Sequence, residues 1–206
     1  TDNILGYLDV VRAHRERDFL VFVTAMGVWC GYDESAYVYA WEGQRWGRIW
    51  ENEQNTYTDE GYLPQTIHDV KISSPDANGD RLLMTLGSQA ACAGSFKDLY
   101  VRVWGVDADH QTAPVLDWAE YASDGYPPIR GQVRPNDVLV QFTVGGIVAG
   151  DGHSAVRHFE VLDGTATQID PIAVRPRDFV IEWIAAPWQE SQTRSESPSL
   201  EEWHTQ

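Results

Sequence analysis

Strand-forming segments recur along this chain at intervals of about 60 residues, and this recurrence constrains the fold more than any other feature. Aspartates open three runs of aliphatic, β-branched and aromatic residues at nearly equal spacings: Asp18, Asp80 and Asp137. Trp41 and Trp104 are separated by almost the same interval, and Phe159 occupies the matching place in the third run. Self-similarity at a fixed interval is typical of tandem structural units. We therefore predict three tandem units, each with about four antiparallel strands.

The predicted units cover residues 1–73, 74–135 and 136–174. Their strand segments are short, rich in Val, Ile, Leu, Tyr and Trp, and bounded by Gly, Asp or Pro, which interrupt strands. With a short C-terminal helix predicted at 176–186, they make a single all-β repeat domain over residues 1–188.

The second unit supplies a resemblance to a known family. Residues 74–88 read "SPDANGDRLLMTLGS", and residues 98–107 read "DLYVRVWGVD". These segments resemble the blades of periplasmic Tol-type β-propellers, which carry a Ser-Pro-Asp-Gly turn before one strand and an acidic-Leu-Tyr start to the next. The chain departs from that pattern, because Ala77 and Asn78 stand between Asp76 and Gly79. The resemblance implies blade-like sheets stacked on one another, and leaves the function open because such folds serve many functions.

Three units are fewer than the 4–8 blades with which propellers typically close. One hypothesis is that the chain is a fragment of a larger propeller, with the opening "NILGYLDVVRAHRERD" (3–18) as the last strand of a further unit. The other is that three sheets pack in a different way, of which a β-sandwich is the main alternative.

The repeat pattern ends at residues 175–188, "RPRDFVIEWIAAPW", which predict a helix. Pro176 suits the first turn, Asp178 complements the positive end of the helix, and Pro187 ends it. Its apolar face should cover the exposed end of the last sheet: Phe179, Val180, Trp183 and Ile184. The segment resembles the C-terminal part of uncharacterised secreted bacterial proteins. The remaining residues, 189–206, are polar and are predicted to be disordered.

Charge and composition limit the partners. The formal net charge is −16, so nucleic acid and anionic membranes should be repelled, and no apolar run approaches the length of a membrane span. We expect a secreted or cell-envelope protein without a cofactor. Cys30 and Cys92 are the only cysteines and occupy matching loops, which is compatible with a disulfide between them; two buried free thiols are the alternative.

Aromatic residues are the candidate ligand-binding residues. Tyr62 and Tyr126 lie in "DEGYLP" and "SDGYPP", again about one repeat interval apart, and are interpreted mainly as repeated corners. Trp46 and Trp50 are four positions apart, so they are predicted to share one face of a strand, where they could stack on a sugar. Most Trp residues stand at matching places in the units, which favours packing between sheets over ligand binding.

Metal ligands are weakly indicated. Asp76, Asn78 and Asp80 alternate as in a calcium loop, but Gly87 stands where an EF-hand needs its bidentate Glu, so a turn is the better interpretation. His153 and His158 lack the spacing of a helical zinc site.

No nucleophile elbow, phosphate loop or dinucleotide fingerprint is present, so no catalytic residue is assigned. The favoured function is a non-enzymatic binding or scaffolding module with a protein or glycan partner, able to form homo-oligomers through sheet edges. The rival is a glycan hydrolase, which requires two carboxyl groups about 5–9.5 Å apart in a cleft lined by Trp.

Overall fold

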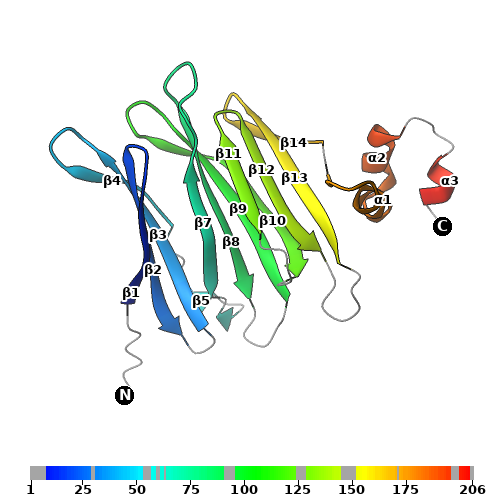
Figure 1. Cartoon of the computed structure of the whole chain (residues 1–206), viewed down its shortest axis with the longest axis horizontal. Coiled ribbons are helices and arrows are strands. Elements are labelled where there is room, and N and C mark those ends of the chain that lie inside the picture. The colour runs from blue at the N-terminus through cyan, green and yellow to red at the C-terminus, as the bar shows by residue number, and fades with distance from the viewer. Residues whose placement is uncertain are drawn as a thin grey trace.

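The structure is a computed structural model, and it describes residues 8–28, 31–52, 57–58, 61–62, 64–90, 96–123, 129–144, 152–170, 172–195 and 200–204. Strands dominate it, and they form three four-stranded antiparallel sheets (Figure 1). Each sheet is an antiparallel meander, because its strands are neighbours in the order in which they follow along the chain.

Sheet 1 contains β1 (Leu8–Glu16), β2 (Phe19–Val28), β3 (Gly31–Trp41) and β4 (Trp46–Asn52). Sheet 2 contains β7 (Gln65–Ile72), β8 (Arg81–Ala90), β9 (Phe96–Val106) and β10 (Thr112–Ser123). Sheet 3 contains β11 (Arg130–Arg134), β12 (Asp137–Val144), β13 (His153–Leu162) and β14 (Thr165–Ile169). A small hairpin of β5 (Tyr57–Thr58) and β6 (Gly61–Tyr62) falls between the first two in the chain. The helices α1 (Pro176–Ala185), α2 (Trp188–Ser191), η1 (Gln192–Arg194) and α3 (Glu201–His204) follow.

The all-β class and the three four-stranded units are confirmed, but the second and third sheets begin one strand earlier than the predicted units. β7 pairs with β8 and belongs to sheet 2, although the first unit was predicted to extend to residue 73. β11 likewise pairs with β12 in sheet 3. β1 pairs with β2 and is therefore the first strand of sheet 1, not the last strand of a further unit. A sequence period gives the spacing of strands, whereas the choice of pairing neighbour depends on long-range register.

The three sheets stand in a row, with sheet 2 in the middle (Figure 1). Alternate residues of β8 point to opposite sides, as in any strand. Leu83 packs in the hydrophobic core shared with sheet 1, while Leu82 and Met84 pack in the core shared with sheet 3. Sheet 2 is therefore covered on both faces, which explains the continuous apolar run "LLM" in its strand.

The row has a direction, set by the aromatic residue that recurs on the third strand of each sheet. Trp104 of sheet 2 packs against Trp50 on the fourth strand of sheet 1, with ring centroids 4.7 Å apart. Phe159 of sheet 3 packs against Trp118 on the fourth strand of sheet 2, at 5.8 Å. Both point toward the preceding sheet. Trp41 holds the matching place in sheet 1 and points to the outer side of the row, where 47% of it is exposed.

A β-bulge corrects the predicted arrangement of the two tryptophans of β4. Trp46 pairs with Trp41, whereas Trp50 pairs with Val38, and the register shifts by one residue between them. Trp46 therefore lies on the outer face of sheet 1, and Trp50, which is 6% exposed, lies in the core. An extra residue in one strand moves the side chains beyond it to the opposite face of the sheet, so two residues four positions apart no longer share a face.

Helix α1 forms where it was predicted, but its buried side is not the apolar one. Asp178 and Glu182 are buried, while Val180 and Ile184 are about half-exposed. The helix packs against the start of β13, before His158, where β14 begins to pair with that strand. Along this stretch the Val156 backbone N–H donates to the Ile172 carbonyl oxygen at 2.8 Å. The Asp178 carboxylate there accepts a hydrogen bond from the backbone N–H of Ser154, at 3.4 Å. A backbone N–H at a strand edge needs an acceptor, so an acidic helix face suits this position better than an apolar one.

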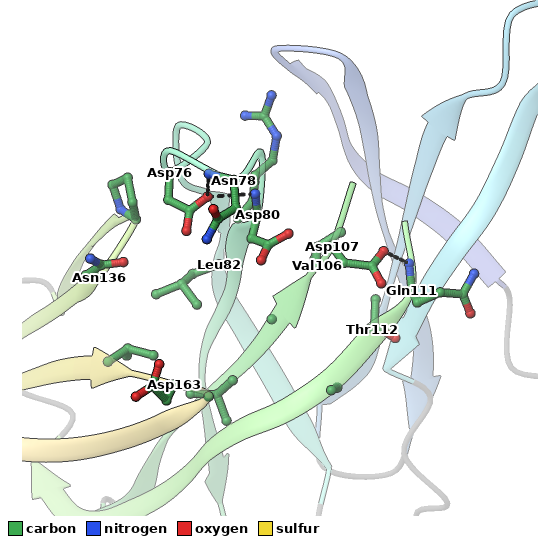
Figure 2. A pocket seen from close by; sticks show the side chains of 17 residues that line it. Asp76, Asn78, Asp80, Leu82, Val106, Asp107, Gln111, Thr112, Asn136 and Asp163 are labelled. Atoms are coloured by element: carbon green, nitrogen blue, oxygen red, sulfur yellow. Dashed lines mark hydrogen bonds between the residues drawn. The ribbon is translucent and has the colours of Figure 1, made fainter. Parts of the chain in front are cut away.

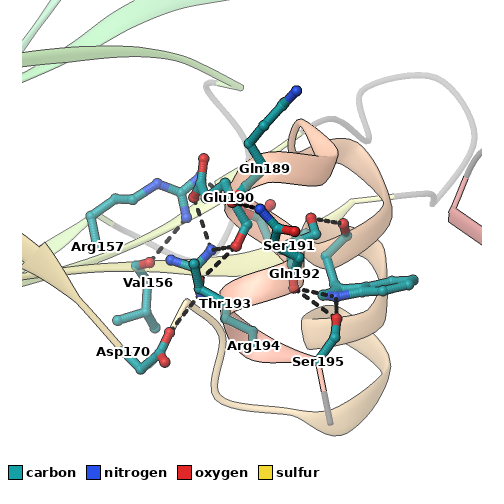
Figure 3. Close-up of polar contacts among 12 residues, drawn as sticks. Val156, Arg157, Asp170, Gln189, Glu190, Ser191, Gln192, Thr193, Arg194 and Ser195 are labelled. Carbon is teal, nitrogen blue, oxygen red and sulfur yellow. Dashed lines mark hydrogen bonds and ion pairs between the residues drawn. The ribbon is translucent and has the colours of Figure 1, made fainter. Parts of the chain in front are cut away.

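Residues 189–206 were predicted to be disordered; in their described part lie the end of α2, η1 and α3. Trp183 of α1 organises it: its indole N–H donates to the backbone oxygen of Ser191 and to the Ser195 hydroxyl, both at 3.0 Å. The Ser191 hydroxyl donates back to the Trp183 carbonyl. Arg194 joins this segment to sheet 3 through Asp170, at 2.7 Å (Figure 3). A part-buried indole that needs a hydrogen-bond acceptor thus positions Ser191 and Ser195 beside α1.

Candidate functional site

A pocket of about 330 Å³ opens where β10, β13 and α1 meet. Its polar lining is dominated by Glu120, His153, Arg157 and Glu182, and Trp118 contributes an aromatic wall. Arg157 is 8% exposed and Glu182 is 9% exposed, although both carry charges. Charged groups are buried only when they are paired, so the pairing decides what this pocket can do.

Arg157 stands at the centre of the cluster. Its Nε and Nη2 atoms donate to the two carboxylate oxygens of Glu120, at 2.7 and 2.5 Å, in the bidentate geometry that suits a guanidinium. Nη2 also contacts Glu182 at 2.7 Å, and the second oxygen of Glu182 contacts His153 Nε2 at 2.5 Å. Burial alone would lower the pKa of Arg157, but its hydrogen bond and ion pair with Glu120 and its contact with Glu182 outweigh that effect and raise the pKa. The cluster ties sheet 2, sheet 3 and α1 together.

The same geometry bears on glycan hydrolysis. Because both carboxylates contact one Nη2 atom, their nearest oxygens lie within about 5 Å of each other, which is close to the separation in retaining glycosidases. The Arg157 guanidinium, however, occupies the space between them and forms ion pairs with both. A glycosidase needs that space for the scissile bond and needs one carboxyl group as a proton donor. This arrangement is therefore suited to holding elements together.

A second pocket, of about 350 Å³, lies among the turns at one end of sheets 2 and 3 (Figure 2). The Asp76 carboxylate accepts hydrogen bonds from the backbone N–H groups of Asn78 and Asp80, at 2.8 and 2.9 Å. Asp107 does the same for Asp109 and Gln111, at 2.9 and 2.8 Å. Each aspartate therefore holds its own turn, and the sequence had indicated only the first. Among the described residues, no cluster of three or more His, Cys, Asp or Glu could hold a metal ion.

The two histidines of β13 have separate partners. His153 contacts Glu182, as described above. His158 contacts Asp137 through Nε2 and the Asp170 carbonyl oxygen through Nδ1, the latter at 2.9 Å. Five positions apart on a strand, they point to opposite faces and do not converge.

Several predicted residues lie outside the described part of the chain: Cys30, Cys92 and Tyr126. Tyr62 is in β6, where its backbone pairs with Tyr57, and its side chain is also outside the described part. The proposed disulfide and the paired tyrosine corner both remain predictions. Among the described residues, no helix has the length and apolar character that a membrane crossing requires.

A buried polar joint connects sheets 1 and 2. Gln65 is fully buried; its backbone N–H donates to Asp33 at 3.2 Å, and its side chain donates to the Glu34 carbonyl oxygen at 2.6 Å. The Tyr100 hydroxyl donates to the Gln65 side-chain oxygen at 3.0 Å. Burial raises the pKa of Asp33, although the hydrogen bond from Gln65 opposes the shift, and burial also raises the pKa of the Tyr100 hydroxyl. The joint is satisfied from within, so it offers no free group to a ligand.

The outer face of sheet 1 carries an apolar, mostly aromatic surface that we call the aromatic face: Leu20, Phe22, Tyr39, Trp41 and Trp46. Phe22 and Tyr39 pack edge to face, with centroids 5.6 Å apart, and Trp41 and Trp46 do so at 5.3 Å. Neither hydrophobic core of the molecule reaches this face, because sheet 1 stands at the end of the row (Figure 1). The surface is thus built like a packed sheet face, yet no described sheet or helix covers it.

The opposite end of the row differs in chemistry. On the outer face of sheet 3, strand alternation places mostly polar residues, among them Gln141, Ser154, His158 and Glu160. Leu139 and Leu162 share that face, without an aromatic cluster like that of sheet 1 among the described residues. The aromatic face differs from the outer face of sheet 3 in being apolar, and a contiguous exposed apolar patch marks an interaction site.

Searches of protein-family models, of curated proteins and of solved structures found no match for this chain.

Proposed function

We propose that the chain is a non-enzymatic binding and scaffolding module that engages another protein through the aromatic face. The observation that carries the proposal is the exposure of Trp41. Its counterparts in sheets 2 and 3 each pack against a tryptophan of a neighbouring sheet, while Trp41 has the same orientation and is 47% exposed. A partner that presents a sheet face would complete the pattern that the molecule already uses twice.

The geometry of the rings favours a protein partner over a glycan. Sugar-binding tryptophans present flat, accessible ring faces, whereas Trp41 and Trp46 are tilted by 63° and pack against each other. Interdigitated rings of this kind match the edge-to-face packing of protein interfaces. We place the module in the cell envelope or among secreted proteins, on the basis of the Tol-type resemblance of residues 74–107, and fractionation of the source cells tests that location.

Site-specific photo-crosslinking tests the proposed surface. The photoreactive amino acid p-benzoylphenylalanine replaces Tyr39 on the aromatic face or, as the control, Val180, which is 50% exposed on α1. Each full-length variant is irradiated in its source cells. We expect a discrete protein adduct from position 39 and none from position 180. The proposal fails if position 39 yields no adduct, or if both positions yield the same ones.

A glycan hydrolase at the Arg157 pocket is the second candidate: Glu120 and Glu182 approach each other beside Trp118, and activity would require the Arg157 guanidinium to leave the space between them. It predicts release of reducing sugar from a panel of polysaccharides and loss of that activity in Glu182→Gln. Activity that Glu182→Gln leaves unchanged would remove this pocket from consideration.

A further inference from the structure

We propose that the partner of the aromatic face is a second copy of this chain, bound about a twofold axis with the two aromatic faces opposed. This inference rests on the proposed function, because it names the occupant of the same surface. It differs from association through sheet edges, since the contact is face to face and leaves the backbone pairing of sheet 1 unchanged.

The aromatic face contains both halves of the contact that the molecule uses between its own sheets. In each internal interface, an aromatic residue of a third strand packs on a tryptophan of a fourth strand. On the aromatic face, Trp41 is on the third strand of sheet 1 and Trp46 is on the fourth. In a twofold dimer the same patch meets itself, so Trp41 of each copy can pack on Trp46 of the other. One surface thus supplies the required pair twice.

The two ends of the row favour this symmetric arrangement over a head-to-tail chain of molecules. Head-to-tail stacking would place the aromatic face on the mostly polar outer face of sheet 3, which includes Gln141, His158 and Glu160. That arrangement would bury polar groups against apolar rings, which is unfavourable unless each group finds a new hydrogen bond. Opposed aromatic faces bury apolar surface on both sides and form a closed dimer, with no exposed copy of the interface left.

Charge is compatible with the twofold contact. The chain as a whole carries a formal charge of −16, so two copies repel each other at long range. The outer face of sheet 1, however, also presents Arg48 and Glu51 beside the aromatic residues. They form an ion pair at 2.7 Å and are about half-exposed. Because both signs are present at the margin of the patch, Arg48 of one copy can approach Glu51 of the other.

Sedimentation equilibrium of the purified full chain tests the inference. We expect a concentration-dependent dimer that strengthens as salt screens the repulsion between the two acidic molecules. Trp41→Glu should abolish the dimer, because the twofold axis brings two new carboxylates into the interface at once. Val180→Glu adds the same charge on α1 and should leave the dimer unchanged.

Each outcome decides the inference. A wild type that stays monomeric at high concentration overturns it, as does a dimer that Trp41→Glu leaves intact. Circular dichroism verifies that each variant is folded, and Tyr39→Lys provides a second disruption of opposite charge if Trp41→Glu does not fold. A monomeric wild type that crosslinks from position 39 to a different protein would overturn the second copy while supporting the proposed function. Absence of any adduct would refute both.

Discussion

Replacing Arg157 with methionine removes the cation at the centre of the buried cluster while preserving most of the side-chain length. Glu120 and Glu182 then remain beside each other without the guanidinium that joins them. Glu182 is 9% exposed, so water can replace the lost partner only in part, and His153 remains in contact with it. Arg157→Met is therefore expected to leave the fold of sheets 1 and 2 in place and to weaken the attachment of α1 to sheet 3.

The size of the effect follows from burial. Removing one partner of a buried ion pair typically costs about 3–5 kcal/mol, because the remaining charge is left without compensation. With a urea m-value of about 2 kcal/mol/M, such a loss would lower the unfolding midpoint by about 1.5–2.5 M. Arg194→Met is the matched control, because the partners of Arg194, Asp170 and Glu190, are 64% and 50% exposed. Exposed pairs contribute only about 0–1 kcal/mol.

Urea unfolding of both variants, followed by circular dichroism, measures the difference. If Arg157→Met lies within about 1 kcal/mol of Arg194→Met at neutral pH, the buried cluster does not hold α1 in place.

Three further outcomes are expected. Because burial raises the pKa of Asp33 above its ordinary 3.8, the folded protein binds that proton more tightly than the unfolded chain, and the wild type loses stability as the pH rises through this range. In urea unfolding, Asp33→Asn should therefore gain stability relative to the wild type as the pH rises, and a stability difference that does not change with pH would contradict the shift. Gly87→Ala should lower the free energy of unfolding by about 1–3 kcal/mol, since the added Cβ would lie 2.7 Å from a backbone oxygen. Gly27→Ala is the control: its Cβ would have no atom within 4 Å, so thermal denaturation should show it to be nearly neutral. Trp104→Ala empties part of the core between sheets 1 and 2, and its loss of unfolding free energy should approach the value of about 3–5 kcal/mol that is typical of a buried tryptophan. At low protein concentration Trp41→Ala should lose less than half as much, and equal losses would mean that Trp41 is already covered.

Much of the candidate site depended on contacts that no local pattern reveals. Trp46 was a candidate from its residue type, and it does lie on the aromatic face. Trp50 was paired with it by spacing, but the bulge turned it into the core. The Arg157 cluster was missed because Glu120 lies far from Arg157 in the chain. The one available signal was a charged residue at a core-facing position of β13, between Ala155 and Phe159.

Sequence patterns were enough to predict the all-β class, the three four-stranded units and the position of α1. Those features depend on local properties: turn-forming Asp and Gly, β-branched and aromatic strand residues, and a proline that starts a helix. Long-range contacts were needed to show that β7 joins sheet 2, that α1 turns its acidic side inward, and that Trp41 is exposed at the end of the row. These outcomes are set by pairing register and by the burial of distant groups against one another, where the free energy of a residue depends on partners that its own neighbourhood in the chain does not specify.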